Sequence, residues 1–237
     1  MSTASFQRAR TDAQRDQRRR DVLDAARGML DQMPLAEISL RELSRRVGLA
    51  KSNVVRYFPS REAVFLAVLA EDWDSWLDQL RDQLAAAPPP GTVRPGPVPH
   101  ERHQELAAAI AGTLAGQRRM CELISAAQTI LEHNIPASTA REFKMAAHAR
   151  TRRLAGLVQS AVPGLTGARA FEFAGLTWAL IAGAWPIANP SPVVAQVLAE
   201  PGLRDLCVEF GPALTSVLTV VLDGMTITAD SGGHTSR

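Results

Sequence analysis

Apolar residues recur at every third or fourth position along almost the whole chain, which places them on one face of an α-helix. The longest such run joins Val64 to Leu84, with further apolar residues at 65, 68, 69, 73, 76, 77 and 80. The alternation of apolar and polar residues that predicts half-buried strands is nearly absent. The sequence therefore predicts an all-α protein.

Prolines and glycines divide the chain into helical segments. The stretch at 87–99 is too rich in both for a helix and is expected to be a surface loop. Before it, we expect a first helix closed by Pro34, two short helices and a long helix that ends near residue 86. After it, we expect helices at about 101–116, 119–133, 138–161, 167–188 and 203–223. Residues 1 to about 15 are expected to form a mobile charged arm, and residues 228–237 a disordered tail.

Charge is distributed unevenly along the chain. The net charge of +2 divides into +6 for residues 1–61, with 13 Lys/Arg and 7 Asp/Glu, and −4 for the remainder. A basic head on an acidic body indicates that the head, and not the body, meets a polyanion such as nucleic acid.

The segment from Ile38 to Phe58, ISLRELSRRVGLAKSNVVRYF, combines two short helices with a tight turn. Ser39 and Glu42 have the S-x-x-E spacing of a capping box, which marks the start of the first helix. Gly48 ends that helix in a left-handed conformation that costs other residues about 1 kcal/mol. The inner face is predicted to comprise Leu40, Leu43, Val47, Val54 and Phe58. These features predict a helix-turn-helix, whose second helix lies in the major groove of DNA.

The second helix of this motif is predicted to carry polar side chains on its outer face. If Val54 and Phe58 point inward, the outward residues are Lys51, Ser52, Asn53, Arg56 and Tyr57. Arginine reads guanine and asparagine reads adenine in the major groove, while amines, hydroxyls and phenols bind phosphate. A solvated polar face is the alternative for a short polar helix. The capping box, the glycine turn and the basic head favour DNA binding.

Residues 18–75 resemble the tetracycline-repressor (TetR) family of bacterial transcriptional regulators. The resemblance rests on Ala26 and Leu30, on Ser39 to Ser44, on GLAKSNVVRYF at 48–58 and on Ser60-Arg61-Glu62, with the family's spacing kept throughout. It implies an N-terminal arm and three-helix helix-turn-helix domain at 1–62. It also implies a C-terminal helical domain for ligand binding and dimerisation at 63–227, followed by the tail at 228–237.

The resemblance also implies which side chains contact DNA. The base-reading candidates are Lys51, Ser52, Asn53 and Arg56. The candidates that contact the DNA backbone are Ser39, Tyr57 and Arg61. Arg18, Arg19 and Arg20 stand at the start of the first helix and either reach phosphate or the minor groove, or form a solvated basic end.

Four positions depart from the family's pattern. Ala50 replaces the usual serine, which removes a capping hydroxyl worth about 1 kcal/mol. Val55 replaces the common tyrosine, and Tyr57, where histidine is usual, is expected to take over part of the phosphate contact. Arg61 replaces lysine and keeps the positive charge. The base-reading positions carry little family consensus, so the operator sequence does not follow from the resemblance.

Beyond about residue 75 the resemblance is one of architecture. The last two predicted helices, 167–188 and 203–223, are apolar over much of their circumference, so each needs partners on two sides. A homodimer through these helices supplies the second side and presents two heads to two half-sites of double-stranded operator DNA.

The resemblance implies a pocket for a small-molecule effector in the C-terminal body. The candidate lining residues are aromatic or polar side chains that interrupt apolar helix faces, namely Gln128, His133, Phe143, His148, Phe173, Thr177, Trp178 and Trp185. Ordinary core packing is the alternative for each of them.

Other classes of function find no support in the sequence. Cys121 and Cys207 lie far apart without zinc-site spacing, as expected of thiols in a reducing cytoplasm. His100 and His103 do not fit the H-E-x-x-H motif, and nucleotide-binding and nucleophile motifs are absent, so we expect no metal, no cofactor and no enzyme. The apolar stretch around 174–187 is too short to span a bilayer comfortably. We therefore expect a buried core helix in a cytoplasmic protein without membrane contact, associated with the nucleoid when bound to DNA.

The predicted function is that of a sequence-specific DNA-binding transcriptional regulator, a repressor released from its operator by a small-molecule effector. The alternative is a DNA-binding regulator without a small-molecule switch, controlled by a protein partner or by its abundance. A third reading is an enzyme or carrier with a vestigial helix-turn-helix.

Overall fold

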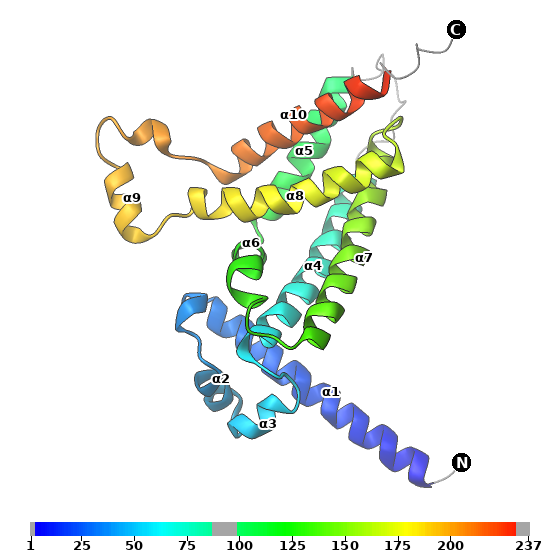
Figure 1. Ribbon diagram of the computed structural model, residues 1–237, viewed down its shortest axis with the longest axis vertical. Coiled ribbons are helices and arrows are strands. Elements are labelled where there is room, and N and C mark those ends of the chain that lie inside the picture. The colour runs from blue at the N-terminus through cyan, green and yellow to red at the C-terminus, as the bar shows by residue number, and fades with distance from the viewer. Residues whose placement is uncertain (1–2, 87–98, 231–237) are drawn as a thin grey trace. The chain divides into compact units, whose positions relative to one another are not determined.

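The computed structural model describes residues 3–86 and 99–230, which contain helices and their connections but no strand (Figure 1). This confirms the predicted all-α class. The helices are α1 (Thr3–Leu30), α2 (Leu40–Val47), α3 (Lys51–Val55), α4 (Arg61–Ala86), α5 (Pro99–Ala115), α6 (Arg118–Ala126), α7 (Ala137–Ala161), α8 (Gly167–Ala188), α9 (Pro192–Leu198) and α10 (Phe210–Asp230). Short turns of other helical types lie at η1 (Leu35–Glu37), η2 (Ala127–Leu131) and η3 (Arg204–Leu206). The loop expected at 87–99 lies outside the described residues, apart from Pro99, which begins α5.

The N-terminal segment, predicted to be a mobile charged arm, is part of a helix, and its mobility stays a prediction. Helix α1 begins at Thr3, so the polar residues up to about 15 are helical. Neighbours one turn apart support the exposed part of this helix, since Gln17 donates to Asp21 at 2.9 Å and Arg20 donates to Gln17 at 2.8 Å. Each such pair adds only about 0.2–0.5 kcal/mol, and the high helix propensity of alanine, glutamine and arginine supports the rest.

The connection between α8 and α10 corrects the sequence prediction. The sequence predicts one helix at 203–223, whereas the structure has α9, η3 and then α10 from Phe210. Ser191 caps α9 and Pro192 occupies its first turn, which are start signals that apolar periodicity does not reveal. Gly202, with a φ of 96°, interrupts the chain after α9. The helix that was expected to start at 203 therefore starts seven residues later.

Helix α10 also extends further than predicted. It runs to Asp230, so residues 228–230 are helical and not part of a disordered tail. Its buried residues continue through Leu222 to Met225, which is one reason why the helix does not end at residue 223. Residues 231–237 lie outside the described residues.

The chain divides into two compact units. The N-terminal unit comprises Met1–Glu71 with Ala127–Phe143, and the C-terminal unit comprises Asp72–Ala126 with Lys144–Arg237. Helix α4 begins in the first unit and ends in the second, so it is a covalent link between them. The domain boundaries predicted at residues 62 and 227 stay predictions.

Helices α1, α2 and α3 enclose the apolar core of the N-terminal unit. Each contributes buried side chains, namely Val22, Ala26 and Met29 from α1, Leu43 from α2 and Val54 from α3, with Phe58 following α3. Leu40 and Val47, which are also predicted to face inward, are half-buried. Because α2 and α3 are short, burial of these side chains rather than helix propensity holds them in place.

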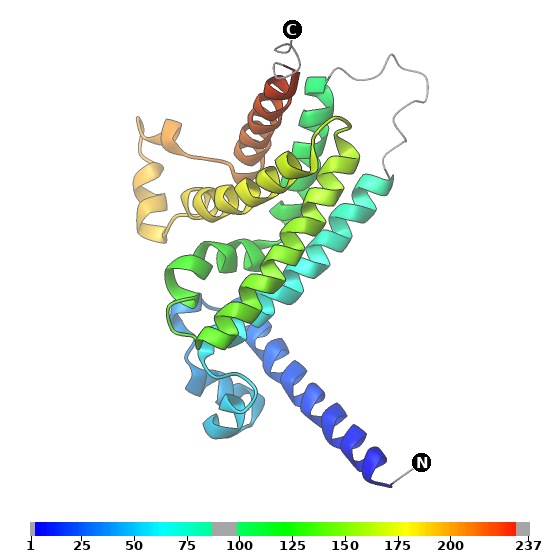
Figure 2. The same cartoon turned by 45° about the vertical axis from the view of Figure 1, so that its right-hand side comes forward.

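In the C-terminal unit, α10 packs against α5 and α8, and α6 packs against α8 (Figure 1). Helix α7 runs alongside the second half of α4 (Figure 2). Polar contacts join these two helices, since Arg150 donates to Asp74 at 2.6 and 2.9 Å and Arg153 donates to Asp78 at 2.6 Å. The hydrogen bond from Arg153 holds the pKa of Asp78 below its ordinary value.

Helix α8 is, among the described residues, a helix long and apolar enough to cross a membrane. One such helix is weak evidence, because the core helix of a soluble protein meets the same criterion. The sequence predicts a buried core helix, but only 28% of its most apolar window is buried within the chain. Phe171, Leu176 and Ile187 are among the apolar side chains that it leaves exposed.

Candidate nucleic-acid interface

Helix α2 begins at the predicted residue. The Ser39 hydroxyl accepts a hydrogen bond from the backbone N–H of Glu42 at 3.1 Å, which satisfies one of the donors that a first helical turn leaves unpaired. The Glu42 carboxylate pairs with Arg45 instead of the Ser39 N–H. Only one half of the predicted capping box therefore forms.

The turn after α2 has the predicted left-handed glycine. Gly48 has a φ of 71°, and its N–H donates to the carbonyl of Arg45 at 3.2 Å. Ser44 is buried and donates to the Leu40 carbonyl at 2.7 Å, so a small polar residue stands where α2 faces its neighbours. These local contacts set the direction in which the chain enters α3.

Helix α3 turns one face to the core and the rest to solvent. Val54 is fully buried, and Phe58 is 3% exposed. The four predicted base-reading residues are all exposed and lie together on α3 and at its C-cap: Lys51, Ser52, Asn53 and Arg56. Ala50 makes no side-chain cap, as predicted. Val55, which is 42% exposed, is an apolar neighbour of the kind that contacts a thymine methyl group.

A hollow of about 550 Å³ lies between α2 and the start of α3. Arg41, Arg45 and Lys51 line it together with Ser39. Neither Arg41 nor Arg45 was predicted from the sequence, although their spacing of four residues places both on the side of α2 opposite the buried Leu43. Glu42, which pairs with Arg45, also lines the hollow, so the hollow keeps a net positive charge, which suits the phosphate backbone of DNA.

Arg61, predicted to contact the DNA backbone, also makes contacts within the protein. Its guanidinium donates to the carbonyl of Ile38 at 2.9 Å and to the Glu62 carboxylate at 3.2 Å. It therefore joins the first residue of α4 to the segment that precedes α2. Tyr57 is half-buried directly after α3. The phosphate contacts of both residues stay predictions.

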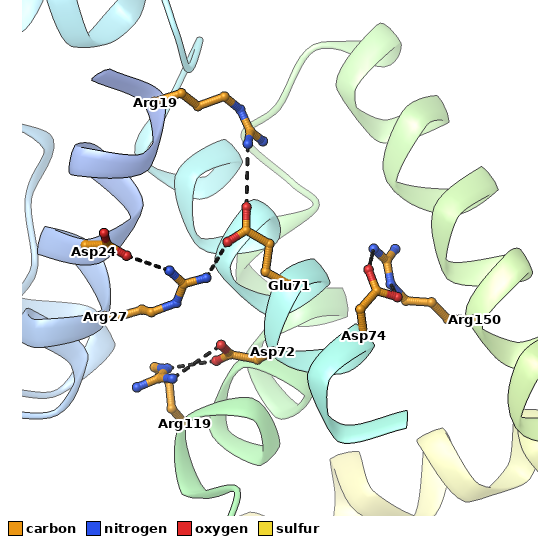
Figure 3. Close-up of polar contacts among 8 residues, drawn as sticks. All are labelled: Arg19, Asp24, Arg27, Glu71, Asp72, Asp74, Arg119 and Arg150. Atoms are coloured by element: carbon orange, nitrogen blue, oxygen red, sulfur yellow. Dashed lines mark hydrogen bonds and ion pairs between the residues drawn. The ribbon is translucent and has the colours of Figure 1, made fainter. Parts of the chain in front are cut away.

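The three arginines near the start of the sequence lie on the exposed surface of α1. Arg18 and Arg20 interact with polar neighbours one turn away in the same helix. Arg19 lies over the Phe58 ring, 5.1 Å from its centroid, and 3.6 Å from the Glu71 carboxylate (Figure 3). Arg19 thus connects α1 with the end of the helix-turn-helix and with α4, while Arg18 and Arg20 keep exposed charge near it.

A further ion pair braces α1 within the N-terminal unit. Glu71 of α4 accepts a hydrogen bond from Arg27 of α1, and Arg27 also pairs with Asp24 at 2.8 Å (Figure 3). With Arg19, these contacts attach α1 to α4 at two points. These polar contacts, together with the buried side chains of α1, connect α1 to the rest of the N-terminal unit.

Three of the predicted pocket residues lie in the N-terminal unit. Gln128 and His133 are exposed, and Phe143 is half-buried. A side chain open to solvent buries little of a ligand, and pockets usually bury most of it. A ligand contact of these three residues stays a prediction.

The other five predicted pocket residues lie in the C-terminal unit. Phe173 and Thr177 are fully buried, Trp178 and Trp185 are half-buried, and His148 is exposed. They do not surround one space, since Trp185 lies against Phe210 and His148 lies against Phe171. A surface hollow of about 230 Å³ in this unit is lined by none of them but by Asp74, Ala146, Ala149, Arg150 and Arg153.

Comparison with known families assigns both parts of the chain. Residues 22–68 match the DNA-binding domain described as bacterial regulatory proteins, tetR family, and residues 70–229 match the tetracyclin repressor-like, C-terminal domain. The chain belongs to the TetR family. Both matched domains are those of bacterial regulatory proteins of this family. The resemblance predicted from residues 18–75 is confirmed.

Two curated TetR-type regulators are similar to part of the chain. The regulator EthR of Mycobacterium tuberculosis is 39% identical over 70 residues, which are 29% of this chain and 32% of EthR. The regulator RutR of Escherichia coli is 33% identical over 64 residues, or 27% of this chain and 30% of RutR. The chain matches about a third of the length of each relative, so neither provides an operator or an effector for it.

A solved structure shows a similar fold over most of the chain. A TetR transcriptional regulator from Rhodococcus sp. RHA1 superposes with a TM-score of 0.52 at 16% identity and covers 89% of this chain and 95% of its own. At this identity the likeness concerns the fold alone. It agrees with a helix-turn-helix head followed by a helical C-terminal domain.

Proposed function

We propose that this TetR-family protein is a homodimeric repressor that binds a pseudo-palindromic operator and leaves it when a small molecule binds the C-terminal unit. The outer face of α3 supports DNA binding, because Lys51, Asn53 and Arg56 are exposed there while Val54 and Phe58 are buried. Lysine, asparagine and arginine carry the donors and acceptors that read base edges in the major groove.

Two sets of residues divide the work on DNA. The exposed residues of α3 read bases, and the two arginines of α2 that line the hollow, Arg41 and Arg45, bind phosphate. Arg56 belongs to the first set, and Arg41 belongs to the second. The two sets have different experimental signatures, because phosphate binding depends on salt and not on sequence.

The test compares Arg56→Ala with Arg41→Ala on the DNA just upstream of the chain's own gene. Arg56→Ala should cost about 1–3 kcal/mol on the natural site and little on DNA altered at the base pair that Arg56 reads. Arg41→Ala should weaken binding to all sequences alike and reduce the salt slope by about one. Arg152→Ala, an exposed arginine of α7 in the C-terminal unit, is the control and should change neither quantity. Identical behaviour of the first two variants would contradict the division into base readers and phosphate binders.

Dimerisation is proposed through α8 and α10. Their apolar side chains at Leu176, Val217 and Val220 are 40%, 42% and 66% exposed within the described chain. Helix α9 buries none of its residues, and Val193 on it is 72% exposed. A second copy related by a two-fold axis would cover this surface and place two α3 helices at two half-sites. The apolar α8 is then a dimer helix, in keeping with a cytoplasmic protein that is nucleoid-associated when bound to DNA.

An effector releases DNA only if it binds one conformation of the dimer more tightly than the other. Loss of base contacts, each worth about 1–3 kcal/mol, is enough to empty an operator. A regulator without a small-molecule switch is the alternative, and the buried unpaired donors of the C-terminal unit, described below, favour a ligand instead. A ligand-bound structure tests the eight predicted pocket residues, and a ligand that touches none of them contradicts that prediction.

A further inference from the structure

Three tryptophans form one cluster in the C-terminal unit. The ring of Trp178 on α8 lies against Trp73 and Trp76 of α4, with centroids 4.0 and 5.4 Å apart and rings inclined by 63° and 76°. Trp76 is fully buried and Trp73 is 5% exposed. Sites for small molecules are lined mainly by apolar and aromatic side chains, with a few polar groups that orient the ligand.

The indole N–H groups of the cluster are not equally satisfied. Trp76 donates to the Thr113 hydroxyl at 3.0 Å, and Trp178 donates to the Thr151 hydroxyl at 3.2 Å. The Nε1 of Trp73 is buried and has no acceptor among the described residues. Buried donors almost always have an acceptor, because leaving one unpaired is costly. The third indole is therefore a donor available to a ligand.

A second buried donor without an acceptor lies on α7. Arg150 of α7 donates to the Asp74 carboxylate through Nε and Nη2, while its buried Nη1 has no acceptor among the described residues (Figure 3). Asp74 directly follows Trp73 in α4, and Thr151, the acceptor of Trp178, directly follows Arg150 in α7. Both unpaired donors thus belong to the segments of α4 and α7 that meet at the tryptophan cluster.

We propose that the tryptophan cluster is the effector site, in which Trp73 Nε1 donates to an uncharged carbonyl oxygen of a small, largely apolar ligand. This inference rests on the proposed effector response and names its site and ligand class. Trp178 is one of the predicted pocket residues, whereas Trp73, Trp76 and Arg150 were not predicted. Neither described hollow is lined by these tryptophans, so binding in the cluster requires the half-buried Trp178 ring to move aside.

The charges around the cluster favour an uncharged acceptor. Arg150 is already neutralised by Asp74, and Asp72 of the same helix is paired with Arg119 at 2.7 Å (Figure 3). A carboxylate ligand would add an unpaired negative charge beside these aspartates. A hydrocarbon would leave the Trp73 N–H unpaired. A ketone, ester or amide avoids both penalties.

The experiment uses three probes of similar size, acetophenone, ethylbenzene and benzoate, which differ in the acceptor that they carry. The full chain is labelled with ¹⁵N at the indole nitrogens, and single tryptophan-to-phenylalanine variants assign the four N–H signals. Acetophenone should shift the Trp73 proton downfield and bind about tenfold more tightly than ethylbenzene or benzoate. Trp73→Phe should bind acetophenone no better than ethylbenzene. Trp185→Phe, which alters a ring outside the cluster, should leave acetophenone binding unchanged.

A purely structural role for Trp73 predicts different results. Trp73→Phe removes an unpaired donor, so the Tm of the free protein should stay the same or rise, while Trp76→Phe loses the bond to Thr113 and should lower it. Three outcomes would contradict the proposed site at Trp73. They are equal affinity for acetophenone and ethylbenzene, binding of none of the probes, and a Trp73 N–H that stays hydrogen-bonded to a water that no probe displaces.

Operator release is measured separately, so that the site and the proposed function can fail independently. Acetophenone bound at Trp73 without release of upstream DNA would support the site and contradict its role as an effector site. Release by a ligand that leaves the Trp73 signal in place would support the effector response and overturn this location.

Discussion

Replacing Gly48 with alanine tests whether backbone conformation alone sets the turn between α2 and α3. Gly48 has a φ of 71°, and a Cβ built there meets nothing within 4 Å. A steric clash is therefore excluded. What remains is the cost of placing a residue with a Cβ in the left-handed conformation, which is about 1–2 kcal/mol. Alanine also restricts the unfolded chain, which offsets about 0.4–1 kcal/mol of this. The variant should therefore lose about 1 kcal/mol of stability.

Gly28→Ala is the matched control for this substitution. Gly28 belongs to the same unit and also has nothing within 4 Å of the added Cβ, but it lies in helix α1. Alanine is favoured over glycine in a helix by roughly 0.5–1 kcal/mol, so this variant should gain stability. The same chemical change is thus expected to have opposite signs at two open positions.

Hydrogen exchange measures both effects within the head. The amides of Leu49 and Phe58 donate to the carbonyls of Ser44 and Val54, so their exchange reports opening of the helix-turn-helix. Gly48→Ala should speed their exchange about fivefold, and Gly28→Ala should not speed it. Unchanged or slower exchange in Gly48→Ala would refute the argument that the left-handed backbone constrains this turn.

Three further predictions follow from single residues. Ala50→Ser should supply the side-chain cap that α3 lacks and stabilise α3 against opening by about 0.5–2 kcal/mol. Amide exchange in α3 should therefore slow, and no slowing would show that serine does not cap there. Burial raises the pKa of Asp223, but hydrogen bonds with two histidines of α5 at 2.6 and 2.8 Å outweigh it and hold the pKa below its usual value. The stability that Asp223 adds is therefore present above about pH 4 and lost below it, so the Tm gap between wild type and Asp223→Asn should narrow from pH 6 to pH 3; a constant gap would contradict this. Burial raises the pKa of Cys121 to about 12, so a thiol reagent at pH 8 should modify Cys207 alone in the folded chain, and a second modified thiol would disprove it.

The features that could be predicted from sequence are those that depend on neighbouring residues. Ser39 and Gly48 mark the two ends of α2 whatever surrounds them, so the helix-turn-helix and its outward residues could be predicted. Helix α8 matches its predicted range because Thr166 caps it by accepting a hydrogen bond from the backbone N–H of Arg169 at 3.3 Å.

The features that could not be predicted depend on contacts between distant residues. Arg19 lies over Phe58, and Arg61 bonds to the carbonyl of Ile38, but no local pattern indicates either contact. The same holds for Trp73, whose apolar helical spacing marks it as core. The indole N–H of Trp73 lacks an acceptor, whereas the other two indoles of the cluster have one. This difference depends on the packing of α4, α5, α7 and α8, which the sequence does not reveal.

The central claim is that the basic head reads operator DNA. The most direct measurement is the affinity of the folded, dimeric protein for the DNA upstream of its own gene at about 50 and 200 mM salt, with scrambled DNA as competitor. A dimer that makes six to ten phosphate contacts should lose about 10³- to 10⁵-fold in affinity between these concentrations and should prefer the upstream DNA at both. Equal affinity for scrambled DNA, or binding that does not depend on salt, would contradict the claim.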